Sequence, residues 1–192
     1  MSLLTTKKLL AGGLLAIAMS LTTTGCLTDD KKDPVDTTTK TVAWATGSDA
    51  DVGAQGHATL GSAIDLDAKK VMLSAEANAN RGLVDFVFVL SGGALKLMTP
   101  FAAKTAGDVT LANGYDATHD VSKLVKVATA PANWTAGKTA FDAGTKVSSA
   151  AIATGEFYVA YTGTNYVLVT VKALAGSTNT AVTTLTISLK GM

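Results

Sequence analysis

The sequence has little of the material from which metal centres and disulfide frameworks are built. Its 192 residues include one cysteine and two histidines. A single cysteine excludes a disulfide framework within the chain and a clustered cysteine zinc site, and two histidines leave few ligands for a transition metal. We therefore expect no metal centre and no cofactor.

Charge is also scarce in this chain. Charged residues make up 16% of it, the formal net charge is +1, and hydrophobic residues make up 47%. This composition is too apolar for general disorder and lacks the basic excess of a nucleic-acid-binding protein. A length of 192 residues fits one domain with an appended segment, since typical domains have roughly 100–200 residues. The sequence thus predicts a packed domain and no nucleic-acid partner.

The amino terminus has the features of a signal peptide. Lys7 and Lys8 precede an apolar run from Leu9 to Met19. This run is about half the roughly 20 residues that a membrane-spanning helix needs, so it is typical of the apolar segment of a signal peptide. A polar stretch then leads to Gly25 and Cys26, the only cysteine of the chain.

Cys26 lies where a signal peptidase would cleave, and its surroundings resemble a bacterial lipobox, although Thr23 stands where a lipobox usually has leucine. The resemblance implies a lipoprotein signal peptide over residues 1–25 and lipidation of the Cys26 thiol. Three acyl chains on one residue would anchor the protein stably, because each buried methylene contributes roughly 0.8 kcal/mol and one chain alone holds only marginally. Ordinary cleavage near Ala16–Ala18, giving a secreted soluble protein, stays open as the alternative.

The segment after the cysteine has the composition of a tether. Residues 26–40 contain Asp, Lys, Pro and Thr without apolar periodicity, which predicts a flexible linker behind the acylated cysteine. Leu27 stands where lipoproteins retained in the inner membrane typically carry aspartate, so the resemblance implies the outer membrane. Asp29 and Asp30 resemble the short acidic signal that sends some lipoproteins of Gram-negative bacteria to the cell surface. A solvated linker is the other interpretation of these two aspartates.

Cleavage before Cys26 would also change the charge of the protein. It would remove Lys7 and Lys8 and leave 14 basic and 15 acidic groups, a net charge of about −1. No long-range field would then favour anionic lipid head groups. We therefore expect the lipid anchor, rather than a basic patch, to hold the protein at the membrane.

Residues 41–192 are predicted to form a β-rich globular domain. The run Asp85–Leu90 is almost wholly apolar and bounded by glycine-containing turns, which is typical of a central strand buried on both faces. Ala94–Met98 is expected to pair with it through a Gly92-Gly93 turn. β-Branched and aromatic runs predict a three-stranded meander near the carboxyl end, in which Val167, Val169 and Val171 alternate with other residues and face the core. The remaining predicted strands and those of the meander are residues 41–45, 121–127, 157–161, 166–174 and 183–190.

Helix signals are few. Ser74 is predicted to cap a short helix that ends at Asn80, and Thr135–Ala143 is predicted to form a second one. Many short β-prone runs separated by turn residues, with one or two short helices, favour a mainly β fold with a β-sandwich-like domain. A closed barrel is the alternative architecture.

Part of the chain resembles a β-rich domain of uncharacterised surface lipoproteins of Gram-negative bacteria. The resemblance rests on Val52–Asp67, the Ala/Asn-rich segment Glu76–Asn80, the strand Val84–Phe88 and the carboxyl-terminal hairpin. It covers roughly Thr41 to Lys190. These motifs are structural, so the resemblance implies a surface lipoprotein and assigns no catalytic or binding residue.

Aspartates are the first candidates for chemistry. Asp65 and Asp67 lie on one face of an extended segment. With Asp49 and Asp51 they could supply oxygen ligands for calcium, which needs six to eight, and solvated turn carboxylates are the alternative. Asp85 begins a buried strand, where desolvation would raise its pKa and suit a hydrolase. A hydrogen bond at the strand end explains Asp85 as well.

The histidines predict no catalytic pair. His119 and Asp120 are adjacent, so their side chains diverge on an extended chain, and a surface turn is the favoured interpretation. His57 stands between Gly56 and Ala58 and is expected in a loop or at a sheet edge. We therefore expect no catalytic site and no enzymatic activity.

Aromatic side chains supply the candidate ligand-binding residues, Trp44 and Trp134. Two or three exposed coplanar rings would stack on sugar rings, as in a carbohydrate-binding module. Core packing is the alternative role for these residues and for the other large amphipathic aromatics, Tyr115, Tyr158, Tyr161 and Tyr166.

The favoured function is therefore that of an outer-membrane or cell-surface lipoprotein. Its partners would be the membrane, through the lipid on Cys26, and a glycan or a protein, through a non-catalytic structural or interaction β-domain. The alternatives are a carbohydrate-binding module on the cell surface and a hydrolase that uses acidic residues such as Asp65, Asp67 or Asp85.

Overall fold

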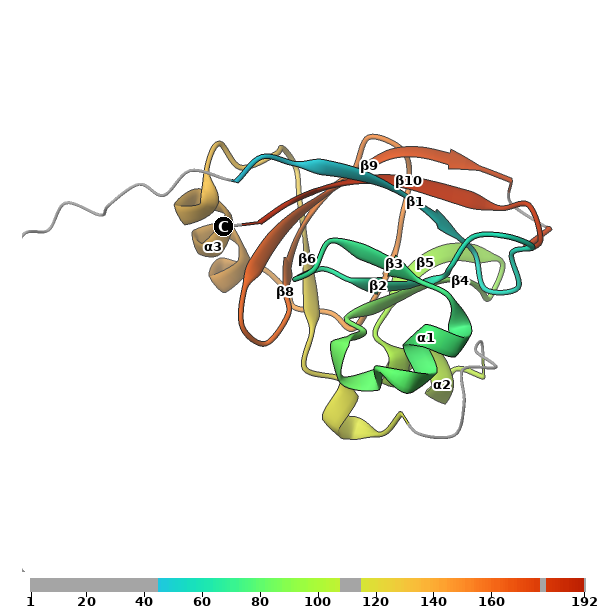
Figure 1. The fold of residues 1–192 in the computed structure, drawn as a ribbon. Helices are drawn as coiled ribbons and strands as arrows, with labels where there is room; N and C mark the ends of the chain where they lie inside the picture. Colours follow the sequence, from blue (N-terminus) through green and yellow to red (C-terminus); the bar gives the residue numbers. More distant parts are fainter. Residues whose placement is uncertain (1–44, 108–114, 177–178, 192) are drawn as a thin grey trace, which may run out of the picture. The chain divides into compact units, whose positions relative to one another are not determined.

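The computed structural model describes residues 45–107, 115–176 and 179–191, and these form a mainly β fold with two antiparallel five-stranded sheets (Figure 1). One, here called the long sheet, has the strand order β1-β10-β9-β8-β6. Its strands are β1 (Ser48–Gly53), β6 (Lys123–Val127), β8 (Phe157–Tyr161), β9 (Tyr166–Ala175) and β10 (Thr184–Lys190). The predicted carboxyl-terminal meander is confirmed, because β8, β9 and β10 are consecutive neighbours in this sheet.

The second sheet, here called the short sheet, has the order β3-β2-β4-β5-β7. Its strands are β2 (Ala63–Asp65), β3 (Lys70–Met72), β4 (Phe86–Ser91), β5 (Ala94–Met98) and β7 (Ser149–Ala151). As predicted, the apolar run forms a strand in the middle of a sheet. It pairs with β5 through Gly92 and Gly93, whose φ angles of 57° and 79° suit the tight hairpin turn.

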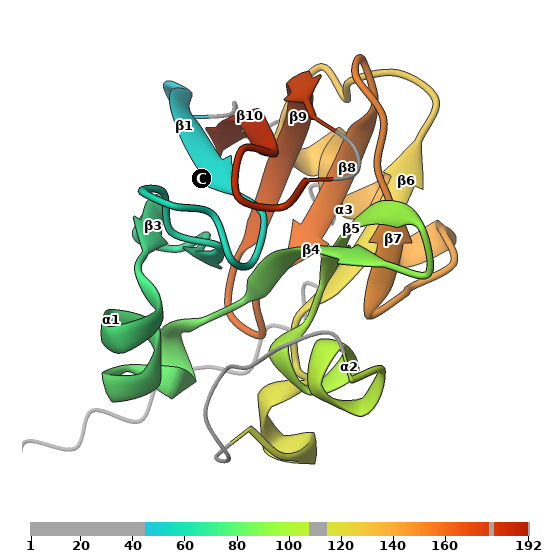
Figure 2. The same ribbon diagram turned by 90° about the vertical axis from the view of Figure 1, so that its right-hand side faces the viewer.

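The two sheets pack face to face as a β-sandwich around the main core, and Figure 2 shows their strands as two layers. Alternate residues of each strand point into this core. The long sheet contributes Val167, Val169 and Val171 from β9, which confirms that these valines face the core. The short sheet contributes Phe86 and Phe88 from β4. The mainly β, sandwich-like fold class predicted from the sequence is therefore correct.

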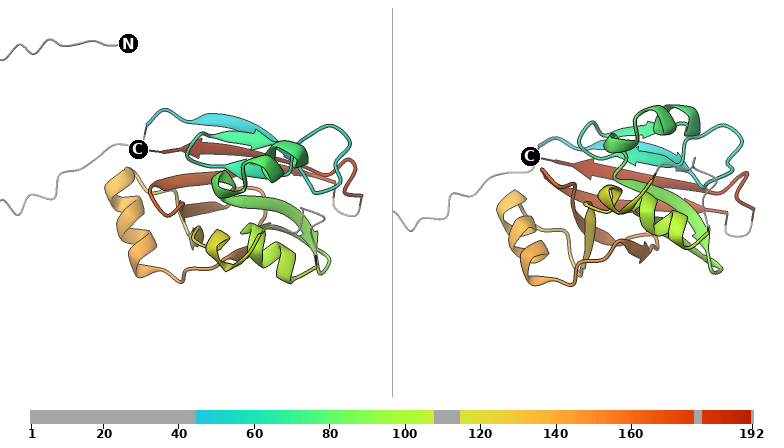
Figure 3. Two further views of the ribbon diagram at one scale, coloured as in Figure 1. Left: turned by 60° about the horizontal axis from the view of Figure 1, so that its bottom comes forward. Right: turned by 90° about the horizontal axis from the view of Figure 1, so that it is seen from below.

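In the described part of the chain, three α-helices cover the outer faces of the sandwich. They are α1 (Ser74–Ala79), α2 (Pro100–Thr105) and α3 (Trp134–Ala143), and two 3-10 turns, η1 (Arg81–Leu83) and η2 (Ala117–His119), lie near the first two. In both views of Figure 3, α3 lies apart from α1 and α2. None of the described helices is long and apolar enough to cross a membrane.

Each outer face has its own small core. Val87 and Val89, on the other side of β4 from its phenylalanines, pack with Ala77 of α1, Ala103 of α2 and Tyr115. This second core explains why β4 is apolar at almost every position, since both of its faces are covered. On the long sheet, Val125 and Val159 pack against Phe141 of α3.

The helix ends differ in part from the prediction. Ser74 does not cap α1: the cap position is Leu73, which makes no side-chain capping bond, and Ser74 is the first helical residue. The predicted second helix is present as α3 and is capped by Asn133, whose side chain accepts a hydrogen bond from the Ala136 amide at 2.9 Å. The helix α2 was not expected; Thr99 caps it and Pro100 occupies its first turn.

Candidate functional site

A pocket of about 260 Å³ lies where η1, η2 and the turn between β8 and β9 meet. We call it the Arg81 pocket. Its wall is formed by Arg81, Gly82, Val84, Asp85, Thr118, His119, Val121, Ser122 and the turn residues Thr162, Gly163 and Thr164. It combines a guanidinium, a carboxyl, an imidazole, several hydroxyls and two valines in a space suited to one small molecule.

Asp85 lies at the buried wall of this pocket, with 7% of its surface exposed. Its Oδ2 accepts a hydrogen bond from the Leu66 amide at 2.8 Å, and its Oδ1 accepts one from the Ser122 hydroxyl at 2.7 Å. Burial raises the pKa of Asp85 to about 6, against the effect of these two hydrogen bonds, and the charges of Asp67 and Asp65 add to the rise. Asp85 therefore changes its charge close to neutral pH.

Arg81 is the only arginine of the chain and lines the same pocket. Among the described residues, its buried Nε atom has no hydrogen-bond partner, and no ion pair involves its guanidinium. The Nε atom itself is closed off from the pocket, but a guanidinium that lines a pocket and has no carboxylate partner is free to meet a ligand with its outer face. In the sequence, Arg81 is only the residue that follows the predicted helix ending at Asn80. Its being the sole arginine was the signal that could have drawn attention to it.

The side chains of His119 and Asp120 contact different partners, as expected for a surface turn. Nδ1 of His119 lies 3.0 Å from Oδ1 of Asp116 and 3.2 Å from its amide nitrogen, which closes a capping box around η2. Asp120 instead accepts hydrogen bonds from Thr99 and from Lys123, the latter at 2.7 Å. The adjacent pair does not form a catalytic dyad.

Asp65 and Asp67 both accept hydrogen bonds that stabilise turns. Oδ1 of Asp65 accepts the Ala68 amide at 2.8 Å and thereby fixes the turn between β2 and β3. Asp67 accepts hydrogen bonds from the hydroxyls of Thr162 and Thr164 at 3.0 and 3.1 Å. Asp67 thus fastens the β8–β9 turn, which forms one wall of the Arg81 pocket, to the short sheet.

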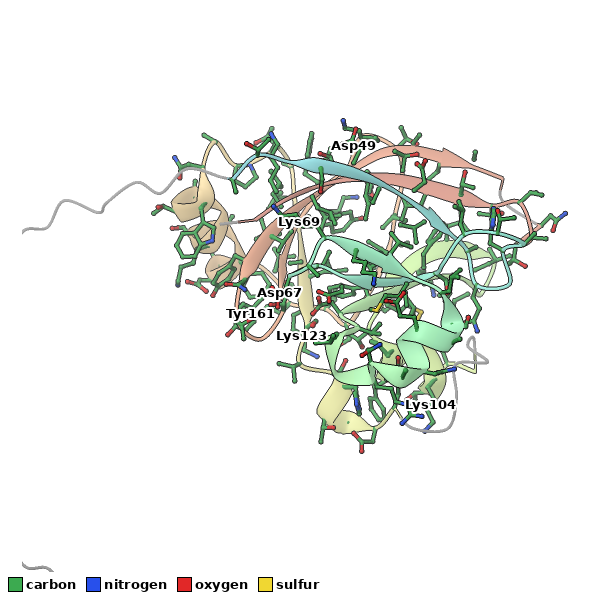
Figure 4. The ribbon with its side chains drawn as sticks, in the orientation of Figure 1. Asp49, Asp67, Lys69, Lys104, Lys123 and Tyr161 are labelled. Atoms are coloured by element: carbon green, nitrogen blue, oxygen red, sulfur yellow. The ribbon has the colours of Figure 1, made fainter. Side chains whose placement is uncertain are left out.

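The four aspartates considered for calcium do not come together. Asp49 pairs with Lys172 and Asp51 accepts the Thr186 hydroxyl, both on the long sheet. Figure 4 shows Asp49 well separated from Asp67. Across the described residues, no three side chains of the Asp, Glu, His and Cys types gather to hold a metal. The calcium interpretation therefore has no site in this part of the chain.

His57 has a local structural role, in the loop where it was expected. Its Nδ1 accepts hydrogen bonds from the Thr59 amide at 3.2 Å and the Leu60 amide at 3.0 Å. These bonds shape the connection between β1 and β2, and His57 is not part of the Arg81 pocket.

The aromatic candidates separate into two groups. Tyr115 and Tyr158 are buried, as expected for core packing. Trp134 begins α3 and meets Tyr166 edge to face, with ring centroids 5.6 Å apart and planes at 87°. Trp134 and Tyr166 therefore do not form one coplanar platform for a sugar, and the ligand-binding role of Trp134 stays a prediction. Trp44 lies outside the described residues.

We call Trp134, Phe141, Tyr161 and Tyr166 the α3 aromatic cluster. Phe141 is buried and lies 5.3 Å from Tyr166 and 5.9 Å from Tyr161, centroid to centroid. The cluster fastens α3 to the outer face of the long sheet, where Figure 4 labels Tyr161.

A second, larger pocket of about 400 Å³ lies beside β6, β7 and β8, and its charged and phenolic groups, those of Lys126 and Tyr158, are already paired. Lys126 forms an ion pair with Glu156, and the Tyr158 hydroxyl donates to Glu156 and to the Ala151 carbonyl. Burial and the neighbouring Glu156 raise the pKa of Tyr158 above its ordinary value, so this phenol stays protonated. The Arg81 pocket is therefore the stronger candidate for a binding site.

Comparison with protein-family models, with curated proteins and with solved structures found no match to this chain.

Proposed function

We propose that the protein is an outer-membrane or cell-surface lipoprotein, anchored through Cys26, whose β-sandwich binds a partner without transforming it. The Arg81 pocket is the binding site in this proposal. The anchor is supported by the sequence alone: a short apolar signal segment, Gly25 and Cys26 at its end, and a polar linker over residues 26–40.

The observation that carries the binding role is the contrast between Arg81 and the carboxylates around it. The carboxylates offered as candidate acids have structural tasks: Asp65 and Asp67 fix turns, and Asp85 accepts two hydrogen bonds. Arg81 lines the pocket, and no carboxylate of the described residues pairs with its guanidinium. In this site the cation has no ion-pair partner among the described residues, and the carboxylates already accept hydrogen bonds within the fold. This arrangement favours binding over acid–base chemistry.

A hydrolase remains the second candidate because the pKa of Asp85 is raised to about 6, as that of a general acid would be. The two hydrogen bonds to Asp85 point away from this role, since they hold both oxygens in place within the fold. A hydrolytic activity that disappears in Asp85→Asn and persists in Asp116→Asn would establish this alternative.

The proposed anchoring is tested by fractionation of Gram-negative cells that express the full chain or its Cys26→Ser variant. We expect the unchanged protein in the membrane fraction, with a lipid on its amino-terminal residue by mass spectrometry, and the variant in the soluble fraction. Ser20→Ala, six residues before the cysteine, is the matched control and should stay in the membrane fraction. A Cys26→Ser protein that still sediments with membranes would overturn the anchor.

Display on the surface is tested separately by adding protease to intact cells. Loss of the full-length protein from intact cells, with a periplasmic control protein left uncut, supports the cell surface. Cleavage only after the outer membrane is permeabilised would place the domain on the periplasmic side and overturn display on the surface.

A further inference from the structure

We propose that the Arg81 pocket binds an acidic sugar of the uronic-acid class, with the sugar carboxylate on the Arg81 guanidinium and the sugar hydroxyls on the threonine and serine oxygens. This inference rests on the proposed function, in which the pocket is a binding site, and it names the class of ligand.

The guanidinium sets the charge and shape of the group that it would recognise. Arginine presents planar, paired N–H donors that match a carboxylate in a two-bond arrangement, and it cannot act as an acceptor. The described residues offer Arg81 no such carboxylate, and its buried Nε–H has lost its hydration without gaining a partner. A ligand carboxylate that meets the guanidinium from the pocket side would supply the missing countercharge, although it would not reach the buried Nε–H.

The hydroxyls that line the pocket favour a ligand that donates hydrogen bonds. Ser122 donates its proton to Asp85, and Thr118 donates its proton to Asp116. On the opposite wall, Thr164 donates to Asp67. A hydroxyl whose proton is already given away has lone pairs left to accept with. The pocket therefore offers acceptors to the O–H groups of a polyol.

The size and the apolar part of the pocket fit one sugar ring. Its volume of about 260 Å³ is below the roughly 300–1,000 Å³ of sites for drug-sized ligands. Val84 and the exposed Val121 line it beside Gly82 and Gly163, which have no side chains to fill the space. A pyranose ring has a C–H face that would lie on these valines while its hydroxyls reach the polar wall.

Asp85 makes the expected binding depend on pH. It faces the hydroxyl of Ser122 and the Leu66 amide, with Asp65 and Asp67 nearby and Arg81 and His119 on the same pocket. Below about pH 6 Asp85 is protonated and no longer repels an anion. Binding of an acidic sugar should therefore tighten as the pH falls from 7.5 to 5.5.

Calorimetric titration of the detergent-solubilised full chain tests the proposal with four probes: glucuronate, glucose, acetate and inorganic phosphate. We expect glucuronate to bind at least tenfold more tightly than glucose or acetate, since each of these lacks one half of the recognised chemistry. Arg81→Gln should weaken glucuronate binding at least tenfold, and Arg81→Lys should weaken it less. Lys172→Gln, which removes an equal charge on β9, is the matched control and should bind like the unchanged protein.

Each other outcome overturns the inference. Equal binding of glucose and glucuronate would show that the cation takes no part, and binding of phosphate alone would make the pocket a simple anion site. Absence of binding by all four probes, with folding verified by circular dichroism, would exclude an acidic sugar. None of these results would affect the fractionation of Cys26→Ser, so failure of the ligand class is distinguishable from failure of the anchor.

Discussion

The Arg81 pocket and the α3 aromatic cluster are two regions with the residue types of a binding site, and only one of them has unused binding capacity. In the cluster, the rings of Trp134 and Phe141 both pack against the ring of Tyr166, with centroids 5.6 and 5.3 Å away. In the pocket, Arg81 has a buried nitrogen without a partner. Residue type alone pointed to the tryptophan, whereas the state of the contacts points to the arginine.

The comparison teaches that a candidate residue must be judged by whether its side chain already makes contacts within the fold. Aromatic rings packed edge to face contribute to stability, about 0.5–1.5 kcal/mol per pair beyond their buried area. An arginine that lines a pocket without a carboxylate partner keeps its charge and its outer N–H groups available to a ligand. Variants of the cluster should therefore change stability and leave ligand binding alone, and Arg81 variants should do the reverse.

The largest expected effect is on the free energy of unfolding, in variants of the α3 aromatic cluster. Phe141→Ala should lower the free energy of unfolding by about 3–5 kcal/mol, because it removes a buried ring that joins α3 to the long sheet. Urea unfolding followed by circular dichroism measures this. Lys138→Gln on the same helix is the control and should change stability little. A loss below about 1 kcal/mol for Phe141→Ala would break the assignment of a structural role to the cluster.

The next largest expected effect is the pH dependence of the free energy of unfolding that Asp85 causes. Its folded pKa of about 6 lies above the ordinary 3.8, so the folded chain holds the proton more tightly than the unfolded chain between these values. The Asp85 contribution to stability is therefore greatest below about pH 4 and falls by up to about 3 kcal/mol as the pH rises through 6.

Urea unfolding of the unchanged protein and of Asp85→Asn at several pH values isolates this contribution. The stability of the unchanged protein relative to Asp85→Asn should fall between pH 4 and pH 7. Asp116→Asn is the control: hydrogen bonds from Thr118 hold the pKa of Asp116 below its ordinary 3.8, so its contribution is lost only below about pH 4 and should stay constant between pH 4 and pH 7. A constant difference for Asp85→Asn across this range would contradict the burial of an ionisable group at the pocket wall.

A smaller effect is expected where the pocket wall is fastened. Asp67→Ala removes the acceptor for Thr162 and Thr164, and we expect a loss of about 1–2 kcal/mol in unfolding free energy together with weaker glucuronate binding. Asp51→Ala is the matched control, since it loses one hydroxyl donor, Thr186, far from the pocket. Unchanged glucuronate affinity in Asp67→Ala would show that the attachment of the β8–β9 turn to Asp67 does not matter for binding.

The smallest effect is expected at the indole nitrogen of Trp134. This buried nitrogen has no hydrogen-bond partner among the described residues, so Trp134→Phe removes an unpaired polar group along with part of a ring. The two changes oppose each other, and we expect a net change within about 1 kcal/mol by urea unfolding. Glucuronate affinity should stay the same. A loss of affinity would show that Trp134 contributes to ligand binding.

Much of the fold followed from local pattern. The apolar run in β4, the glycine hairpin and the valine alternation in β9 are local signals of strands and turns, and each is present as predicted. The strands β2, β3 and β7 are only three residues long, so their sequences contain too few positions for a period to be recognised. The short helix α2 is defined mainly by Thr99 and Pro100 at its start.

The site was less accessible to sequence reasoning, because its walls come from distant parts of the chain. Asp85 was singled out, and its raised pKa follows from the burial that the strand pattern predicted. Ser122 and Thr164 are ordinary among many serines and threonines until the fold brings them to one pocket. Arg81 was visible as a single arginine, but the absence of a partner for it is a property of the tertiary structure.

The most direct test compares the two regions in one spectrum. The protein has one arginine, so the Arg81 Nε–H gives a single side-chain signal in a ¹⁵N-correlated NMR spectrum, and a Trp44→Phe variant assigns the Trp134 indole signal. On titration of the detergent-solubilised full chain with glucuronate, we predict that the Arg81 signal moves and saturates while the Trp134 signal stays in place. A Trp134 signal that moves while Arg81 stays fixed would contradict the account.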